Sequence, residues 1–507
     1  MNVNPPTGAI PALRVHQWLD AWNDLNYDEE NHAKPSEFFY LFSLRASQLR
    51  ALVGIYTRSA SSGTPRSQDT GIQRRHDKER SAEISHYVVG GYPWSTLGDV
   101  KRSDPENHKL RKPGWLPTAV VVNILRPGDE RGGVILAKDA AISIEDQSEK
   151  FSFLNVPEPS LLDDAIPPIE IIDGQHRLFA FEEGDEEAED YELPVVAFNG
   201  LALAWQAYLF WTINIKPKKI NPSLAFDLYP LLREQEWLDS GESVTVYKES
   251  RAQELTEVLW STPDNPWHRR INMLGGTRKE NGPVTQAAFI RSLVASLVKS
   301  WTPIKGIGGL FGGTPGGSDG LTWSRIQQGA FLVTAWRLLA DSVARSQDVW
   351  AENLRQESAE LDIPGLAHTI YREPAFTSTY SLLATDQGVR GYQYVLNDLC
   401  YARHLELRLS EWHDDSDFAE VTPENIESMA RTLEEQPVYD FLKSLCESLA
   451  SYDWRTSGTP HLPEDARRSK AAMRGSGGYK EIRRSLLEHL RQSEIEIVSR
   501  TATLVTV

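Results

Sequence analysis

Short apolar runs bounded by turn-forming residues recur through the N-terminal part of the chain. Runs of this length with Gly, Pro or Asn at their ends are typical of buried β-strands. They predict strands at residues 38–44, 115–125, 132–138, 169–172 and 193–199.

Helical spacing of apolar positions occurs between these runs. Residues 46–56 and 74–91 carry it, and Gly90-Gly91 is a natural end for the second of these helices. The apolar stretch at 201–214 also predicts a helix, which the two prolines and the asparagine of 215–223 would end.

The pattern is almost entirely helical from about residue 225 to the C-terminus, with a glycine-rich loop at 306–320 and no internal repeat. The predicted fold class is α+β, with an N-terminal α/β domain and a large, mostly α-helical C-terminal region. We expect an N-terminal extension at 1–35, an α/β domain at 36–230 and a helical domain at 231–507.

Composition sets limits on the function. The 507 residues are too many for one ordinary domain, and 40% of them are hydrophobic, enough for sizeable cores. Asp and Glu number 71 against 53 Lys and Arg, a formal net charge of −18. Because nucleic-acid backbones are bound by clustered cations, this balance disfavours non-specific binding by the whole surface. A local basic groove remains compatible with it, so DNA stays a candidate partner.

Cysteine usage and hydropathy indicate a cytoplasmic protein without membrane contact. Cys400 and Cys446 are too few for a disulfide framework or a four-thiolate metal site. The N-terminus has no signal-peptide pattern, and no apolar run reaches the ~18 residues of a membrane span. The sequence also lacks the HExxH and Cys-x2-Cys patterns of zinc sites, the Gly-x-Ser-x-Gly elbow of hydrolases and the P-loop of many nucleotide hydrolases.

Charged and polar residues gather in the segment DGQHR, residues 173–177, where a predicted strand gives way to a predicted helix. A helix start offers unpaired N–H groups and a positive dipole end, which favour an anion. Arg177 can bind a phosphate bidentately, His176 can donate to phosphate oxygens or transfer a proton, and Gly174 lets a ligand approach the backbone. The segment therefore predicts an anion site, with phosphate the best candidate. The alternative is that Asp173 caps the helix while His176 and Arg177 make structural hydrogen bonds.

The segment "DGQHR" followed by "LFAF", after an apolar strand, resembles the signature of the DGQHR-domain family, which includes DndB-like proteins associated with DNA sulfur modification. It is similar, more distantly, to the ParB/sulfiredoxin superfamily, which holds nucleotide phosphates with a Gly-x-x-Arg turn between a strand and a helix. Residues 73–88 resemble the family's Arg-bearing helix, and residues 210–232 resemble its Ile-Asn segment. The resemblance covers about residues 36–230, plus a short piece near 475–490.

This resemblance implies a ParB/sulfiredoxin-like N-terminal domain and a role in bacterial DNA modification or phage defence. It implies nucleoside triphosphate hydrolysis with four catalytic candidates, Asp173, Gln175, His176 and Arg177. Asp173 becomes a candidate ligand of Mg²⁺ or a group that orients water. The candidates for binding the nucleotide phosphates are Gly174, Arg74, Arg75, Arg80, Asn214 and Lys216.

Plain structural roles remain open for several of these residues. Arg80 and Glu83 are three apart on one helical face and would pair as an ordinary ion pair. Asn214 would end a helix, and Lys216 would be a solvated lysine at a proline-rich turn.

A basic stretch near the C-terminus is a second candidate site for phosphate or nucleic acid. Residues 467–484 carry seven Lys and Arg against one acid, and the glycines of 475–478 precede a predicted helix. The alternative is a basic surface loop that pairs with acidic neighbours. The residues expected to contact phosphate are Arg474, Lys480, Arg483 and Arg484.

The acid-rich segments are expected to be solvated loops. Residues 182–192 hold eight carboxylates, and residues 411–420 hold five beside a histidine. The glycine-rich segment 306–320 is expected to be a loop rather than a phosphate cradle, because it has no Lys-Ser/Thr pair.

Three functional hypotheses follow from the residues and the resemblance. The first is a nucleoside triphosphate hydrolase centred on the DGQHR segment, with other modification or defence proteins as partners. The second is a non-catalytic DNA-binding regulator or scaffold of a modification operon that uses the same pocket to sense a nucleotide or DNA. The third is a ParB-like nuclease, for which one carboxylate at the motif is a thin basis for two-metal chemistry.

Overall fold

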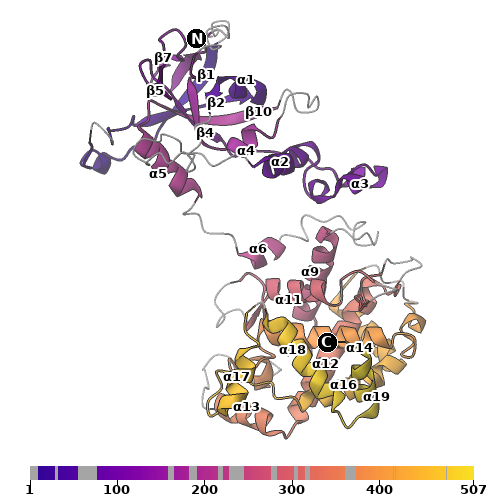
Figure 1. The fold of residues 1–507 in the computed structure, drawn as a ribbon. Helices are drawn as coiled ribbons and strands as arrows, with labels where there is room; N and C mark the ends of the chain where they lie inside the picture. Colours follow the sequence, from indigo (N-terminus) through magenta and orange to yellow (C-terminus); the bar gives the residue numbers. More distant parts are fainter. Residues whose placement is uncertain are drawn as a thin grey trace. The chain divides into compact units, whose positions relative to one another are not determined.

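A computed structural model describes most of the chain, which divides into two compact units, Met1–Lys218 and Lys219–Val507 (Figure 1). The helical second unit and the sheet-containing first unit confirm the predicted α+β class. The described residues are 9–28, 32–54, 77–157, 165–181, 191–214, 221–227, 245–275, 282–301, 306–313, 320–359, 373–414, 416, 418, 420–475 and 477–506.

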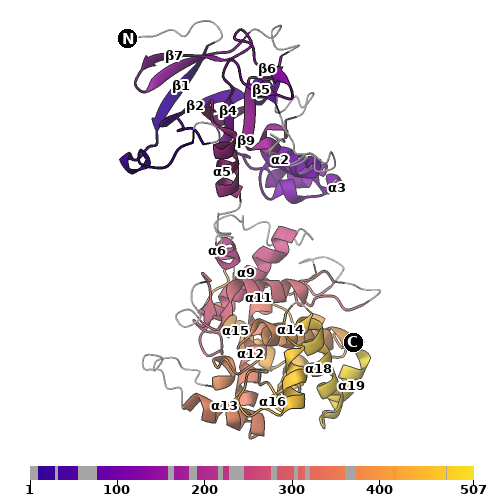
Figure 2. The same ribbon diagram turned by 60° about the vertical axis from the view of Figure 1, so that its left-hand side comes forward.

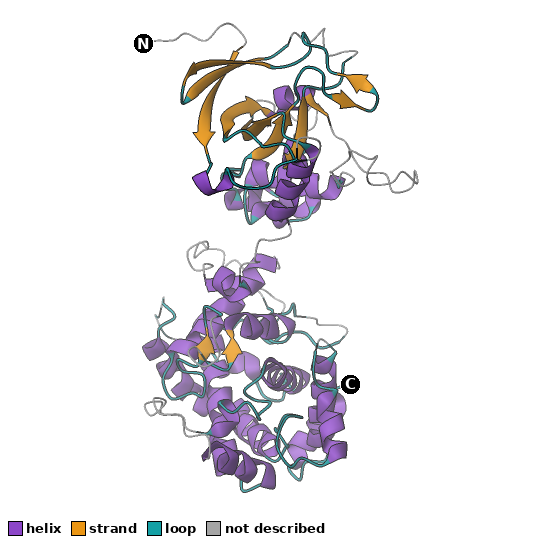
Figure 3. Ribbon diagram, turned by 90° about the vertical axis from the view of Figure 1, so that its left-hand side faces the viewer, coloured by secondary structure: helices purple, strands orange, loops and turns teal. Residues whose placement is uncertain are grey.

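The first unit is built on a curled sheet of eight strands, drawn in orange in Figure 3. The strand order is β3-β9-β4-β10-β2-β1-β8-β7, with parallel pairing of β3 to β9 and of β4 to β10 and antiparallel pairing elsewhere. The strands are β1 (Ala9–His16), β2 (Phe38–Arg45), β3 (Val53–Gly54), β4 (Val120–Ile124), β7 (Ser143–Ser148), β8 (Phe151–Asn155), β9 (Ile169–Asp173) and β10 (Glu192–Asn199). A separate two-stranded ribbon is formed by β5 (Glu130–Arg131) and β6 (Val134–Ile135).

β9, which ends at the DGQHR segment, and β10 both lie inside the sheet. Leu193, Val195 and Ala197 of β10 are buried and alternate with more exposed neighbours, as expected for a strand with one face on the core. In β9 the first four residues are all buried, since both faces of this strand are covered. Asp173 ends this buried strand and pairs with Val121 of β4.

Helices of the first unit cover the end of the sheet that carries the motif. The helix α2 packs against α4, and α5 packs against β9 (Figure 2). The start of α2 is fixed by Asp77, whose Oδ1 accepts hydrogen bonds from the amides of Glu79 at 3.1 Å and Arg80 at 3.2 Å. The helices are α1 (Ala46–Leu52), α2 (Lys78–Gly90), α3 (Asp99–Arg102), α4 (Gln175–Leu178) and α5 (Leu203–Asn214), with 3₁₀ turns at Asp20–Trp22, Trp94–Thr96 and Pro105–Leu110.

A buried polar network ties four elements of this unit together, β4, β5, β9 and α5. Glu170 of β9 forms an ion pair with Arg131, whose Nη2 lies 2.9 Å from Oε2. The same oxygen accepts from Asn123 Nδ2 of β4 at 3.2 Å and from Gln206 Nε2 of α5 at 3.1 Å. Because a buried charge needs partners of this kind, the network fixes α5 against β9.

The predicted elements of the first unit are found with shifted ends. The strand expected at 115–125 is shorter, Val120–Ile124, and the strand expected at 132–138 is reduced to β6. Residues 9–16, within the expected N-terminal extension, form β1 and pair with both β2 and β8. The superfamily-level ParB/sulfiredoxin assignment stays a prediction.

The second unit is a helical assembly around one large apolar core. Trp267, Trp323, Trp336 and Trp454 are fully buried in it. Its principal helices are α6 (Pro222–Asp227), α9 (Thr245–Ser261), α11 (Gln286–Ala295), α12 (Arg325–Arg345), α13 (Val349–Ala359), α14 (Asp386–Ala402), α15 (Pro423–Glu434), α16 (Pro437–Ala450), α17 (Glu464–Ala471), α18 (Gly478–Arg491) and α19 (Glu496–Leu504), with 3₁₀ turns at Pro374–Phe376 and Leu409–Glu411 and the short strands β11 (Ile271–Asn272) and β12 (Val284–Thr285). Among all the residues described in the two units, no helix is long and apolar enough to cross a membrane.

Candidate phosphate-binding site

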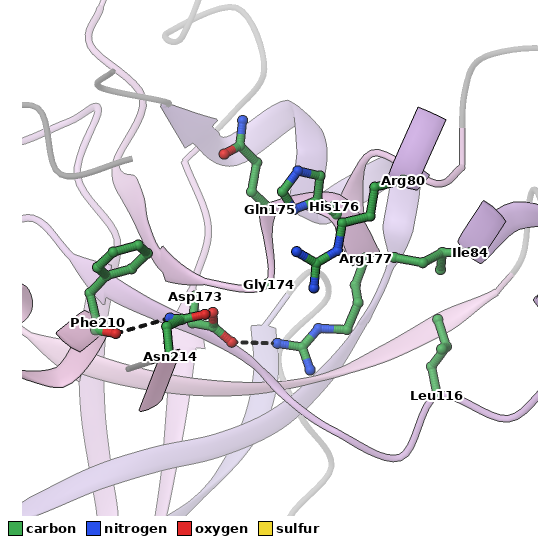
Figure 4. Close-up of a pocket in the computed structure, with 10 residues that line it drawn as sticks. All are labelled: Arg80, Ile84, Leu116, Asp173, Gly174, Gln175, His176, Arg177, Phe210 and Asn214. Atoms are coloured by element: carbon green, nitrogen blue, oxygen red, sulfur yellow. Dashed lines mark hydrogen bonds and ion pairs between the residues drawn. The ribbon is translucent and has the colours of Figure 1, made fainter. Parts of the chain in front are cut away.

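The DGQHR segment lines a pocket of about 330 Å³ in the first unit (Figure 4). β9 ends at Asp173, Gly174 makes the turn, and Gln175 begins the single turn of helix α4. The other walls come from α2, α5 and the segment before β4. The lining residues are Arg80, Ile84, Leu116, Asp173, Gly174, Gln175, His176, Arg177, Phe210 and Asn214.

An ion pair orients Arg177 at the base of this pocket. Its Nη2 lies 2.7 Å from Asp173 Oδ2, and its Nη1 donates to Thr118 Oγ1 at 2.6 Å and to the Thr118 carbonyl at 3.3 Å. The side chains of Asp173 and Arg177 are only about one-fifth exposed. Asn214 Nδ2 donates to the other oxygen of Asp173 at 3.1 Å, so both carboxylate oxygens already have a donor.

Two N–H groups of Arg177 remain without an acceptor among the described residues. A guanidinium has five N–H donors, of which Nη1 uses both of its own and Nη2 uses one. The remaining donors, on Nε and Nη2, form the edge that matches two oxygens or one shared oxygen of a phosphate.

The guanidinium of Arg177 packs closely against Gly174, where the absence of a side chain makes room for it. A Cβ placed on Gly174 would lie 2.9 Å from Arg177 Nη2 and 3.2 Å from Arg177 Nε. The same Cβ would lie 3.1 Å from Val120 Cα, so a side chain at this position would crowd both the arginine and the start of β4. Gly174 also has φ 99°, a left-handed conformation that favours glycine.

A second cation enters the pocket from α2. Arg80 lies in the first turn of this helix and is exposed, and Figure 4 shows its guanidinium pointing into the pocket between His176 and Arg177. Within the part of the chain that the structure describes, this guanidinium has no hydrogen bond or ion pair, so the expected pairing with Glu83 is not formed. Arg80 is therefore available to an anionic ligand.

His176 is held at the contact between α2 and α4. Its Nε2 lies 3.4 Å from the backbone N of Asp77, a long contact that favours the tautomer with the proton on Nδ1. Its carbonyl accepts from Ser81 Oγ at 3.3 Å. The motif histidine thus helps to position α2, and with it Arg80, over the motif.

Gln175 is buried, and its amide is turned away from the Asp173–Arg177 pair in Figure 4. Its Nε2 has no hydrogen-bond partner among the described residues. In this conformation the amide does not reach a ligand held between Arg80 and Arg177.

The capping role considered for Asp173 is not formed. The N-cap residue of α4 is Gly174, and no side chain caps the helix. The helix-dipole argument is also weakened, because α4 has four residues and the amides of Arg177 and Leu178 already donate to the Gly174 carbonyl. Among the described residues of the pocket lining, the permanent positive charges are therefore those of Arg80 and Arg177.

The described residues do not provide a metal site of several ligands. No group of three or more His, Cys, Asp or Glu side chains is placed to hold an ion there. Asp173 is the one carboxylate of the pocket lining, and both of its oxygens accept hydrogen bonds. The pocket residues thus fit poorly to Mg²⁺ as a resident ion.

The remaining predicted site residues fall into two groups. Arg74, Arg75 and Lys216 lie outside the described residues, as do 182–190 of the acid-rich segment. In the second unit, Arg483 donates to Asp398 at 2.7 Å, and Arg484 pairs with Glu481 and Glu488, whereas Arg474 and Lys480 are exposed. The structure therefore shows acidic partners for two of these four basic residues, Arg483 and Arg484.

Thr118, Leu116 and Phe210 contribute to the pocket but are not indicated by the motif. Thr118 lies in the segment before β4, and only the pairing of β4 with β9 brings it to Arg177. No sequence signal near these residues marks them as part of a site.

Comparison with known families supports the resemblance read from the motif. Residues 35–231 match the DndB family model, which is described as DNA-sulfur modification-associated. This confirms the DndB-like resemblance over the segment that holds the pocket and associates it with DNA sulfur modification. No curated protein and no solved structure gives a significant match to the chain.

Proposed function

We propose that this chain is a DGQHR-motif protein of a bacterial DNA-modification or anti-phage defence system and that its pocket binds the phosphates of a nucleoside triphosphate. The observation that carries this proposal is Arg177 in the lining of the pocket, held by Asp173 and Thr118 while its Nε has no acceptor among the described residues. Arg80 adds a second cation without a partner among the described residues. Two guanidinium groups around a glycine turn suit the charge and shape of a phosphate chain.

The second part of this proposal is that the bound nucleotide is hydrolysed. Arg80 and Arg177 would stabilise the charge that spreads over the phosphoryl oxygens in the transition state. His176, on the same turn, is the group placed to transfer a proton. Any Mg²⁺ would enter with the nucleotide and be held mainly by phosphate oxygens and water.

A non-catalytic regulator or scaffold is the second candidate, favoured by two observations. Both oxygens of Asp173 are occupied by Arg177 and Asn214, and the amide of Gln175 points away from the pocket centre. Neither residue is therefore placed to orient an attacking water in this conformation. A protein that senses a nucleotide or DNA through this pocket needs only the two arginines.

The experiment is nucleotide binding and phosphate release, measured with ATP and GTP, with and without Mg²⁺ and DNA. Arg177→Ala and Arg80→Ala are compared with the wild type, with circular dichroism as the control for folding. Binding and release that both vanish in the variants support a hydrolase. Binding without release assigns the chain to the regulator class. The absence of binding by the wild-type protein would overturn the proposal.

A further inference from the structure

A second pocket of the first unit has walls made mainly of aromatic side chains. It has a volume of about 380 Å³ and lies between the segment joining β1 to β2, the end of β10 and α5. The rings used here are Trp18, Trp22, Tyr27, Trp205 and Tyr208. None of these residues lines the DGQHR pocket.

Hydrogen bonds hold these rings in place, and the rings also pack on one another, as in the stacked pair Trp18–Tyr27 and the edge-to-face pair Trp18–Trp22. Trp18 Nε1 donates to Asn23 Oδ1 at 3.0 Å, and Trp205 Nε1 donates to the Ala33 carbonyl at 3.0 Å. Tyr27 donates its hydroxyl proton to the Trp22 carbonyl at 2.6 Å. A pre-ordered aromatic wall loses little side-chain entropy when a ligand binds.

Several large side chains of this pocket are unusually exposed to solvent. Trp22 is 39% exposed, Leu25 52% and Tyr208 54%. Contiguous apolar surface of this kind marks an interaction site.

The charge around the pocket selects between classes of ligand. Among the described residues of 17–37, the acids are Asp20, Asp24, Asp28 and Glu37, and Lys34 is the one lysine. Lys34 itself lies over the ring of Trp18, with Nζ 5.1 Å from the centroid, and pairs with Glu37 at 3.1 Å. The hydrogen bond from Lys34 lowers the pKa of the Glu37 carboxyl, so this carboxylate stays ionised at neutral pH. The chain thus already places one ammonium group on this aromatic wall.

From this combination we propose that the aromatic pocket docks a protein partner through a segment that presents arginine or lysine among apolar side chains. The ring faces attract the cation, the acidic rim adds long-range attraction, and the apolar walls bury the flanking side chains. An unpaired nucleobase would also stack on such rings. The acidic rim disfavours the phosphate backbone that a nucleobase brings with it, so a basic protein segment fits better.

The test uses fluorescence anisotropy with three labelled probes: a peptide of alternating arginine and leucine, the same peptide with glutamate for arginine, and a thymidine oligonucleotide of equal length. The arginine peptide is expected to bind the full-length protein and the other two probes are not. Trp22→Ala and Tyr208→Ala should each weaken this binding about three- to tenfold, the range of a lost cation–π contact. Glu37→Gln should weaken it and reduce its sensitivity to salt.

Trp115→Ala is the matched control, because Trp115 is 75% exposed in the same unit and lines neither pocket. This variant should bind the arginine peptide as the wild type does. Nucleotide binding should be unchanged in Trp22→Ala, which separates this site from the DGQHR pocket.

Three outcomes would overturn the proposal. They are no binding of the arginine peptide, equal binding of the arginine and glutamate peptides, and displacement of the arginine peptide by the oligonucleotide. Equal binding by Trp22→Ala and the wild type would place the peptide elsewhere on the protein, and this would also overturn the proposal.

Discussion

Arg177 Nη2 donates to Asp173 Oδ2 at 2.7 Å across the DGQHR turn, and this ion pair leaves the Nε–Nη2 edge of the arginine facing Gly174. The carboxylate thus sets the direction of the guanidinium and leaves Nε without an acceptor among the described residues. Asn214 holds the same carboxylate from α5, so the orientation of Arg177 depends on three elements of the first unit.

Removing the charge of Asp173 should weaken nucleotide binding while the fold is kept. In Asp173→Asn the acceptor of the Arg177 hydrogen bond loses its charge, so the guanidinium is held less firmly. We expect this to weaken the binding free energy by about 1 kcal/mol, or roughly fivefold in affinity. The measurement is calorimetric titration with ATP. Asp146→Asn is the control, since it breaks the ion pair of Asp146 with Arg14 in the same unit, away from the pocket. Equal affinity of Asp173→Asn and the wild type would contradict this role.

Gly174→Ala should lose both stability and binding. Its φ of 99° is strained for alanine by about 1–2 kcal/mol, and the new methyl group would occupy the space in front of Arg177 Nε and Nη2. Gly128→Ala is a matched control, because Gly128 has φ 95° and a Cβ there would meet nothing within 4 Å. Both variants should lose stability in urea unfolding through backbone strain, Gly174→Ala more so because its Cβ would lie 3.1 Å from Val120 Cα, but only Gly174→Ala should lose nucleotide binding. A Gly174→Ala protein that binds normally would show that the ligand does not use this space.

The network around Glu170 should dominate the stability of the first unit. Glu170→Gln removes the carboxylate that Arg131 pairs with on β9, and breaking a buried pair in this way costs about 3 kcal/mol. The double variant Glu170→Met with Arg131→Met should recover part of the loss, because neither charge is then left alone. Urea unfolding of the wild type, of Glu170→Met, of Arg131→Met and of the double variant measures the coupling between the two side chains. A Glu170→Gln protein as stable as the wild type would show that the pair is dispensable.

The two cysteines should report the unfolding of the second unit. Burial raises the pKa of the Cys446 thiol to about 12 and that of Cys400 as well, and both side chains are fully buried. A thiol reagent should therefore label neither cysteine in the native protein at neutral pH and both in denaturant. As the pH rises above the ordinary thiol pKa of 9.0, the unfolded chain ionises first, so the free energy of unfolding should fall. Rapid labelling of the native protein would show that this core opens readily.

The strands and helices that frame the motif could be predicted because their apolar periodicity is strong. The runs at β2, β9 and β10 are bounded by turn residues, and α5 is apolar over most of its length. The pair β7 and β8 gives no comparable signal, because β7 (Ser143–Ser148) is mostly exposed and polar. β1 was expected to lie in an extension, since its sequence contains Pro11 and its place in the sheet depends on distant partners.

The chemistry of the pocket could be predicted only in part from the sequence. The motif identified Asp173, Gly174 and Arg177 as neighbours, and the family resemblance pointed to Arg80 and Asn214. The contact of Thr118 with Arg177 depends on the pairing of β4 with β9, which sequence spacing does not encode. The aromatic pocket was missed for a similar reason, because Trp18 and Trp205 meet through tertiary packing.

The most direct test of phosphate binding compares Arg80→Ala with Lys78→Ala. Both residues are exposed cations in the first turn of α2, but only Arg80 lines the pocket, and its guanidinium has no partner among the described residues. Each substitution removes one positive charge and leaves the described contacts of the fold intact. Calorimetric titration with ATP and GTP in the presence of Mg²⁺ should show binding by the wild type and Lys78→Ala, with at least about tenfold weaker binding by Arg80→Ala. Equal binding by Arg80→Ala and Lys78→Ala, or no binding by the wild type, would contradict the central claim that this pocket holds nucleotide phosphates.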